Sequence, residues 1–270
     1  MQETEIAARG LVLLGCGKMG SAMLAGWLAR GLPAASVWVI DPQPSDWVHG
    51  TGVHLNTDLP ADPAVVLVAV KPQMMGDALP ALAAFGGGRA VFVSVAAGTA
   101  LATFEAAFGA QTPIVRAMPN TPAAIGRGIT AICANPAGQE ALALAEMLLS
   151  AVGDVVRLDD EGQMDAVTGV SGSGPAYVFH LIEALAAAGV AQGLPEAVSM
   201  RLAKATVAGA GALAMEAAED PSQLRVNVTS PNGTTQAALE VLMDDAAGFA
   251  PLLGRAVAAA TQRSKELAGG

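Results

Sequence analysis

The sequence predicts an α/β protein built as two successive parts: a doubly wound, mainly parallel sheet first and an all-helical part after it. An apolar run leads into a glycine-rich turn close to the N-terminus. Short apolar runs then alternate with helix-like segments as far as residue 158, which is typical of parallel βαβ units. Beyond that point the strand patterns stop and apolar helix patterns follow.

The glycine-rich turn comes directly after the apolar residues 11–14. It consists of Gly15, Cys16, Gly17, Lys18, Met19 and Gly20. In this spacing the first glycine permits a tight turn, the second lets the backbone approach a pyrophosphate, and the third lets the next helix pack closely on the strand. The helix start then points free amides at the anion. The turn therefore predicts a Rossmann-type dinucleotide-binding domain.

Asp41 supports the same prediction. It follows the second apolar run, residues 37–40, at the place where an acidic residue binds the ribose hydroxyls, about 20 residues beyond the glycines. The alternative is an ordinary strand-to-helix turn in which Asp41 only caps the following loop.

Nearly continuous apolar runs predict strands that are covered on both faces. The expected strands are residues 11–14, 37–40, 65–70, 91–95, 114–116, 129–132 and 155–158. Helices are expected at 21–29, 77–84 and 139–151, and a run of three glycines at 86–88 separates the second helix from the next strand. The dinucleotide-binding domain is expected to span residues 1–158.

Residues 159–270 are expected to form a helical domain for substrate binding and dimerisation. Helices are predicted at 175–190, 196–215, 234–243 and 251–267. They are so apolar that such a small domain has too little polar surface to stand alone. We therefore expect a homo-oligomer built through these helices, the alternative being that they bury one another within the chain.

The composition excludes several classes of protein. A formal charge of −10 over 270 residues gives no basic footprint for nucleic acid. The acidic N-terminus lacks the basic and apolar segments of a signal peptide, so a cytoplasmic location is expected. The longest stretch without charges, residues 166–182, contains glycines, serines and a histidine, so we expect no membrane-spanning helix and no membrane partner.

The sequence also gives no sign of a metal site or a disulfide. Its two cysteines lack C-x-x-C spacing, and its three histidines have no partners at the spacing of metal ligands. Cys16 is interpreted as a small residue of the turn. His180 is interpreted as a core or interface histidine.

Polar and turn residues follow several of the expected strands. Lys71 and Pro72, residues 96–99 and residues 118–122 leave the sheet at the edge where open α/β sheets bind ligands. Each alone is also typical of an ordinary loop, and Lys71 of a solvated surface charge. Together they predict the rim of a crevice.

Two later segments place small and hydroxyl residues at helix starts. Residues 171–175 lack the register of a hydrolase nucleophile elbow and are interpreted as a helix start, with Ser173 or Gly174 capping it. Residues 227–235 gather hydroxyls and bare amides, which suit a carboxylate ligand. An elaborate helix cap is the alternative for this second segment.

These motifs, in this order, resemble pyrroline-5-carboxylate reductase over essentially the whole chain. The resemblance rests on residues 15–20, 69–72, 116–122, 171–177 and, above all, 227–242. It implies the last step of proline biosynthesis, reduction of the C=N bond of 1-pyrroline-5-carboxylate to L-proline by hydride from NADH or NADPH. It also implies a homodimer through the C-terminal helices and, in many members, larger rings such as a decamer.

The resemblance also assigns roles to single residues. Besides the glycine turn, it implies that the cofactor lies along Ala69, Val70, Lys71, Pro72 and Ala97, with Met118 and Asn120 beside the nicotinamide. It implies that the substrate carboxylate is held by Ser230, Gly233, Thr234 and Thr235. Thr235 would lie near the ring nitrogen as proton donor or positioner, which makes it the candidate catalytic residue.

Two positions depart from the family pattern. Asn232 stands where the family usually has glycine, and because asparagine tolerates the left-handed conformation, the loop is expected to survive. Asp41 stands where many NADPH-preferring relatives have a hydroxyl or basic residue, and no Arg or Lys occurs in residues 37–70. A carboxylate there repels a 2′-phosphate, so we expect a preference for NADH.

Two rival hypotheses come from the same residues. A different imine or β-hydroxyacid reductase would be expected to carry a lysine in the helix that opens the second domain, where this chain has residues 173–180 without one. A non-catalytic dinucleotide sensor would keep residues 15–20 but would have no reason to keep residues 230–235.

Overall fold

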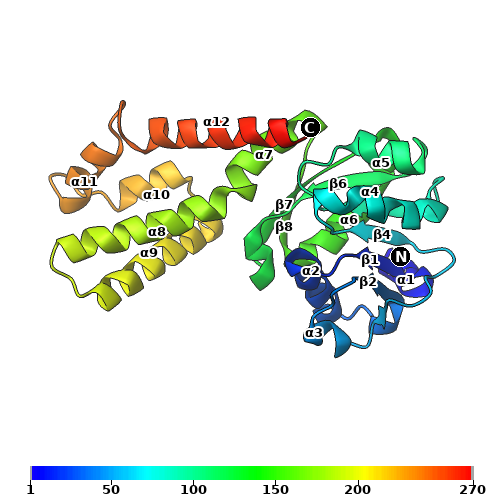
Figure 1. Ribbon diagram of the computed structural model, residues 1–270. Coiled ribbons are helices and arrows are strands. Elements are labelled where there is room, and N and C mark those ends of the chain that lie inside the picture. Colours follow the sequence, from blue (N-terminus) through cyan, green and yellow to red (C-terminus); the bar gives the residue numbers. More distant parts are fainter. Residues whose placement is uncertain (1, 269–270) are drawn as a thin grey trace. The chain divides into compact units, whose positions relative to one another are not determined.

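The computed structural model describes residues 2–268, which form two compact units (Figure 1). The first unit holds the chain up to Gly172 and again from Thr261, and the second holds Ser173–Ala260. The last strand of the first unit ends at Arg157. A domain division directly after residue 158 stays a prediction.

The first unit is organised around an eight-stranded sheet of order β3-β2-β1-β4-β5-β6-β7-β8. Neighbouring strands are parallel except β6 and β7. The first six strands follow the Rossmann order, so the predicted fold class is confirmed. The strands are β1 Leu11–Leu14, β2 Val37–Ile40, β3 His54–Leu55, β4 Val65–Val68, β5 Val91–Ser94, β6 Ile114–Met118, β7 Gly128–Ala134 and β8 Gly153–Arg157.

Every strand that the sequence predicts is present, although several ends differ. β4 stops two residues earlier than predicted because the chain turns away toward Pro72, which has no amide hydrogen for a sheet. The two-residue strand β3 was not predicted, since His54 and Leu55 form no apolar run. It extends the sheet beyond β2, where the His54 ring stacks on Trp38.

An apolar layer covers each face of the sheet. Side chains alternate along β1, so Leu11 and Leu13 join one layer and Val12 and Leu14 join the other. Helices α1, α2 and α6 complete the first layer, and α4 and α5 contribute to the second. The α-helices of this unit that come before the second unit in the chain are α1 Gln2–Arg9, α2 Lys18–Ala29, α3 Asp46–His49, α4 Met75–Ala78, α5 Leu101–Phe108, α6 Leu142–Leu149 and α7 Met164–Val167.

Two of the predicted helices are only partly α-helical. The segment expected at 77–84 is the end of α4 followed by the 3₁₀ helix Leu79–Phe85, in which Pro80 removes a backbone donor. The segment expected at 139–151 is α6 with a short 3₁₀ helix on either side. The sequence did not predict α1 or α5, which are eight residues each and have little room for a helical period.

The second unit is helical, as predicted. Its helices are α8 Gly174–Ala191, α9 Glu196–Glu216, α10 Pro221–Asn227, α11 Thr234–Leu242 and α12 Phe249–Ala268, which ends in the first unit. Only the short α10 was not predicted. Helices α8 and α9 lie side by side (Figure 1), joined by a hydrogen bond of 2.6 Å from Ser199 Oγ to the Ala186 carbonyl. Gly189 permits this approach, because a Cβ there would lie 2.1 Å from Ser199 Oγ.

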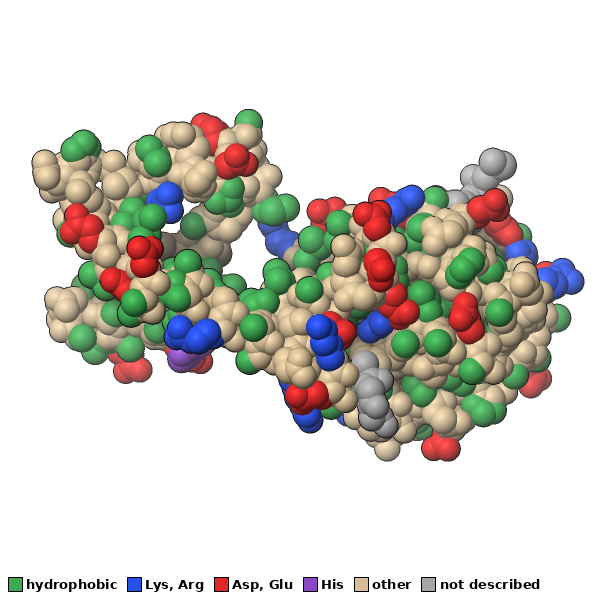
Figure 2. Space-filling view, turned by 90° about the horizontal axis from the view of Figure 1, so that it is seen from above, with side chains coloured by type: hydrophobic (Ala, Val, Ile, Leu, Met, Phe, Trp, Pro, Cys, Tyr) green, Lys and Arg blue, Asp and Glu red, His purple; other side chains and the backbone are tan. Residues whose placement is uncertain are grey.

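The helical unit has almost no apolar core within a single chain. Among the residues that the structure describes, Ala186 and Ala203 are its only buried apolar side chains. Large apolar side chains such as Phe179 and Leu202 are more than half exposed, and hydrophobic groups stand out on this unit in Figure 2. The helices therefore do not bury one another. His180 is also exposed beside Glu183, so its interpretation as a core residue is wrong and an interface role is left.

One helical stretch, Glu161–Ala191, is long and apolar enough to cross a membrane by length and composition. The expectation that no helix spans a membrane stays a prediction. Only 6% of the apolar window is buried within the chain. Length and composition alone are weak evidence, since an apolar helix that packs against another protein chain passes the same test.

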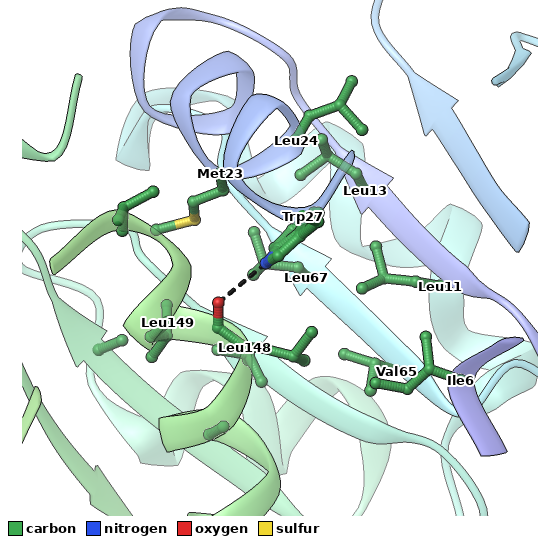
Figure 3. Packing of buried hydrophobic residues seen from close by; sticks show 14 of the residues in the cluster. Ile6, Leu11, Leu13, Met23, Leu24, Trp27, Val65, Leu67, Leu148 and Leu149 are labelled. Atoms are coloured by element: carbon green, nitrogen blue, oxygen red, sulfur yellow. Dashed lines mark hydrogen bonds between the residues drawn. The ribbon is translucent and has the colours of Figure 1, made fainter. Parts of the chain in front are cut away.

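Trp27 of α2 contacts α6 in the first apolar layer of the sheet (Figure 3). Its ring is 3% exposed and packs in the same apolar layer as Leu13, Leu67 and Leu149. The indole Nε1 donates a buried hydrogen bond of 2.9 Å to the Leu148 carbonyl. The side chain therefore fills the layer and also fixes the end of α6.

Replacing Trp27 with phenylalanine is expected to lower the free energy of unfolding by about 1–3 kcal/mol, because the hydrogen bond to Leu148 is lost in a buried position. Trp47→Phe is the matched control: Trp47 is 45% exposed, so a change within about 0.5 kcal/mol is expected. Urea titrations followed by circular dichroism at one protein concentration measure both. Equal effects of the two substitutions would contradict the role of the buried bond.

Candidate functional site

The segments that follow five strands leave the sheet along one edge. Leu14 at the end of β1 lies in register with Ile40 and Val68, and Ser94 lies in register with Arg116. The carboxyl ends of β1, β2, β4, β5 and β6 therefore share this edge, where open α/β sheets bind ligands. The predicted cofactor residues lie on these five segments, except Met118, which is the last residue of β6.

The three glycines of the turn meet different demands. A Cβ on Gly15, whose φ is +88°, would lie 2.9 Å from the Ala69 carbonyl oxygen, and a Cβ on Gly20 would lie 2.3 Å from the Gly15 carbonyl oxygen. A Cβ on Gly17 would meet no atom within 4 Å. Packing thus requires the first and third glycines, and the second leaves open space at the start of α2. That helix has no capping side chain, so its first amides suit an anion such as a pyrophosphate.

Asp41 is bonded to the glycine turn. Its Oδ2 accepts a hydrogen bond of 2.6 Å from the Cys16 amide, and its Oδ1 accepts one of 2.8 Å from the Gln43 amide. Asn56, held in a left-handed conformation, bonds both backbone groups of Asp41. Each carboxylate oxygen can accept a further hydrogen bond. Asp41 therefore caps its own loop and also keeps a negative charge beside the turn.

The loops after β4 and β5 differ in how they meet the turn. Ala69 and Val70 are partly buried, and both lie against Gly15. Lys71 and Pro72 are exposed, as is Ala97 on the loop after β5. The structure thus brings the first two residues onto the glycine turn and leaves the others accessible at the same edge.

Met118 is the last residue of β6 and Asn120 follows the strand, and both contact the segment that leads to α8. The Asn120 side chain accepts a hydrogen bond of 3.0 Å from the Ile129 amide and donates to the carbonyl and hydroxyl of Ser171 at 3.4 and 3.3 Å. Gly172 lies against the methyl end of Met118. Residues 171–172, which the sequence assigned only to a helix start, therefore reach the candidate cofactor edge.

A partly buried ion pair stabilises this edge and was not predicted. Arg116 in β6 is 8% exposed, and its guanidinium bonds Glu161 Oε1 at 2.6 Å. The same oxygen accepts a hydrogen bond from the Leu101 amide at the start of α5. An arginine inside an apolar strand run was the available signal, since a buried arginine needs a charged partner.

The loop before α11 carries the predicted substrate residues in the second unit. Asn232 has a φ of +58°, which confirms that asparagine takes the left-handed conformation there. A Cβ on Gly233 would lie 2.4 Å from Ser230 Oγ, so the tight loop requires glycine. Helix α11 has no capping side-chain hydrogen bond at Gly233, and Gln236 bonds the Asn232 amide instead. The cap contact at this helix start therefore comes from Gln236, and the carboxylate site stays a prediction.

Comparison with known proteins gives the family. A family model for pyrroline-5-carboxylate reductase dimerisation matches residues 161–267, and one for NADP oxidoreductase, coenzyme F420-dependent, matches residues 10–98. A pyrroline-5-carboxylate reductase of Pseudomonas aeruginosa is 42% identical over 96% of both chains. The chain belongs to the pyrroline-5-carboxylate reductase family.

Further relatives of the same family agree with this assignment. One from Synechocystis is 48% identical over 75% of this chain and 74% of its own. The solved reductase of Coxiella burnetii superposes with a TM-score of 0.90 at 33% identity, covering 96% of this chain and 98% of that one. That of Plasmodium falciparum, solved with NADP bound, gives 0.81 at 27% identity over 96% and 98%.

Membership of the pyrroline-5-carboxylate reductase family makes the chain an NAD(P)H-dependent oxidoreductase and replaces both rival hypotheses. The family model for dimerisation covers the whole of the helical unit, Ser173–Ala260. Within residues 2–268 no group of three or more His, Cys, Asp or Glu side chains could hold a metal ion.

Both cysteines are expected to resist modification in the native protein. Burial raises the pKa of Cys133 to about 11, and it also raises the pKa of Cys16. Only the thiolate form of a cysteine reacts quickly with a disulfide reagent. When the pKa is raised, little of the thiol is in the thiolate form at a pH below that pKa. Titration with Ellman's reagent at pH 8 should find no fast thiol in the native protein and both after denaturation. A fast thiol in the native protein would contradict this.

Proposed function

We propose that this chain reduces 1-pyrroline-5-carboxylate to L-proline with hydride from NAD(P)H, the final step of proline biosynthesis. The observation that carries the proposal is family membership over the whole chain, with the glycine turn in one unit and the Ser230–Thr235 loop in the other. These two features match the two molecules that the reaction needs. A cofactor with a pyrophosphate suits the first, and a small carboxylate suits the second.

The chemistry asks little of the protein besides binding and orientation. The nicotinamide supplies a hydride to C5 of the cyclic imine, whose nitrogen takes up a proton, so that the C=N double bond becomes the C–N single bond of proline. The imine can arrive already protonated, so a strong general acid is not required. The protein must hold the carboxylate, orient the ring nitrogen and fix the ring face that is attacked.

The cofactor residues follow from the glycine turn. We assign the pyrophosphate to the amides at Gly17–Met19, where Gly17 presents no Cβ to a ligand, and the ribose to Asp41. The structural support for this assignment is the open space beside Gly17, where an added Cβ would meet no atom within 4 Å. The loops 69–72 and 97 would line the cofactor, and Met118 and Asn120 would lie beside the nicotinamide.

The substrate residues lie on the loop before α11. Ser230, Gly233 and Thr234 would hold the carboxylate with hydroxyls and amides at an uncapped helix start. Thr235 is the next residue along α11 and is partly buried. Its hydroxyl would bond the ring nitrogen. It remains the candidate catalytic residue.

We also propose a homodimer through the exposed apolar helices. The near absence of buried apolar side chains in the second unit supports it, because those side chains need a second chain to cover them. A closed ring of dimers such as a decamer would add a further contact between dimers. A cytoplasmic location stays part of the proposal.

The purified protein should oxidise NADH when it is given 1-pyrroline-5-carboxylate at neutral pH, with proline as the product. It should use NADH in preference to NADPH, because the Asp41 carboxylate would bond the ribose hydroxyls and repel a 2′-phosphate, and no Arg or Lys occurs in residues 37–70. Absorbance at the nicotinamide band with each cofactor measures this. Equal or better use of NADPH would contradict the preference, and no turnover of a folded protein with either cofactor would contradict the function.

Asp41→Asn tests the origin of that preference. It removes the charge but keeps one side-chain oxygen for the backbone amides of Cys16 and Gln43. The ratio of kcat/KM for NADH to that for NADPH should fall by about tenfold, equivalent to about 1.4 kcal/mol. Asp154→Asn makes the same change on β8, at the far edge of the sheet from β2, and should leave the ratio unchanged.

Replacing Thr235 with alanine is expected to lower kcat/KM about ten- to a hundredfold, because a hydrogen bond to a charged group contributes about 1.5–3 kcal/mol. Thr235→Ser keeps the hydroxyl and should retain most of the activity. NADH affinity, measured by fluorescence titration, should stay the same in both variants. An alanine variant as active as the serine variant would remove Thr235 from the mechanism.

A further inference from the structure

Met118 stands at the carboxyl end of β6, where its side chain is partly exposed at the candidate cofactor edge. A thioether side chain is unbranched and flexible, so it takes the position that its neighbours leave to it. The position of its methyl group therefore depends on what packs against it. In this structure Met118 packs against the second apolar layer, and its methyl end lies against Gly172.

Gly172 ends an unusual piece of backbone. Residues Thr168–Gly172 form a π-helix directly before α8. Such π-helical turns are rare and are frequent at functional sites, because they redirect a few residues within a longer helix. Here the turn brings the Cα of Gly172 so close to Met118 that a Cβ at residue 172 would lie 2.6 Å from the Met118 methyl carbon.

The backbone at Gly172 has little freedom to yield. The neighbouring residue, Ser171, receives two hydrogen bonds from the Asn120 side chain, on its carbonyl and on its hydroxyl. Asn120 is itself fixed to β7, since its Oδ1 accepts the Ile129 amide at 3.0 Å. The far end of the Met118 side chain is therefore the part that moves when residue 172 gains a Cβ.

We propose that Gly172 is a positioning residue of the reductase: by having no side chain, it lets Met118 lie where it supports the nicotinamide ring for hydride transfer. This inference rests on the proposed function. Hydride transfer requires the reacting atoms to be close and aligned, and a misplacement of about 1 Å can lower the rate about a hundredfold. The glycine turn and Asp41 hold the other end of the cofactor and do not depend on residue 172.

Gly172→Ala is accordingly expected to lower kcat about ten- to a hundredfold, while the dissociation constant of NADH changes less than about twofold. The effect should disappear in a Met118→Ala background, where no methyl group remains to be displaced, so the two substitutions should be strongly non-additive. Gly76→Ala in α4 is the matched control, because a Cβ on Gly76 meets no atom within 4 Å. It should match the unchanged protein in all assays.

The fluorescence of bound NADH gives a readout that needs no turnover. Gly172→Ala should change the emission of the bound nicotinamide, and adding Gly172→Ala to Met118→Ala should change it no further. Circular dichroism melting of all variants separates these effects from a loss of folding. A rate loss of the same size with and without Met118, or no loss at all, would overturn the inference. An inactive unchanged protein would instead overturn the proposed function, and the emission would still decide the role of Gly172.

Discussion

The close approach of backbone to backbone at Gly15 and Gly20 is the constraint on which the first unit depends. The start of α2 lies so near the turn that a single added carbon at Gly20 would fall 2.3 Å from a carbonyl oxygen. This packing fixes where α2 runs, and thereby where Trp27 reaches α6. The same geometry leaves the amides at Gly17–Met19 free, so the fold and the anion site arise from one local arrangement.

Polar side chains of the protein itself hold the loops of the ligand edge. Asp41 bonds the Cys16 amide, Asn120 bonds the Ile129 amide, and Glu161 bonds the Leu101 amide while it pairs with Arg116. In each case a side chain from one segment satisfies a backbone group of another. Loops fixed in this way lose little further conformational entropy when a ligand binds, which favours high affinity. The fixed loops also favour alignment of the reacting atoms.

Much of this could be predicted from the sequence, because apolar period and glycine spacing are local signals. β1 and β2 were predicted to the residue, and the helices of the second unit nearly so. Contacts between distant segments gave no such signal: the bonds from Asn120 to Ser171 join residues 51 positions apart. The π-helix before α8 has no sequence period of its own. The exposure of His180 was also not predicted. Apolar neighbours in the sequence indicate that a residue is buried, but they do not tell whether it is buried within its own chain or against a second chain.

The scarcity of buried apolar side chains in the second unit has a consequence for how this half of the protein responds to its surroundings. A domain that completes its core only with another chain gains stability from mass action, so dilution acts on it as a mild denaturant. The first unit has its own two apolar layers and does not share this dependence. Substitutions on the exposed faces of α8 and α9 would therefore weaken assembly when the protein concentration is low. At high concentration the same substitutions would change assembly very little.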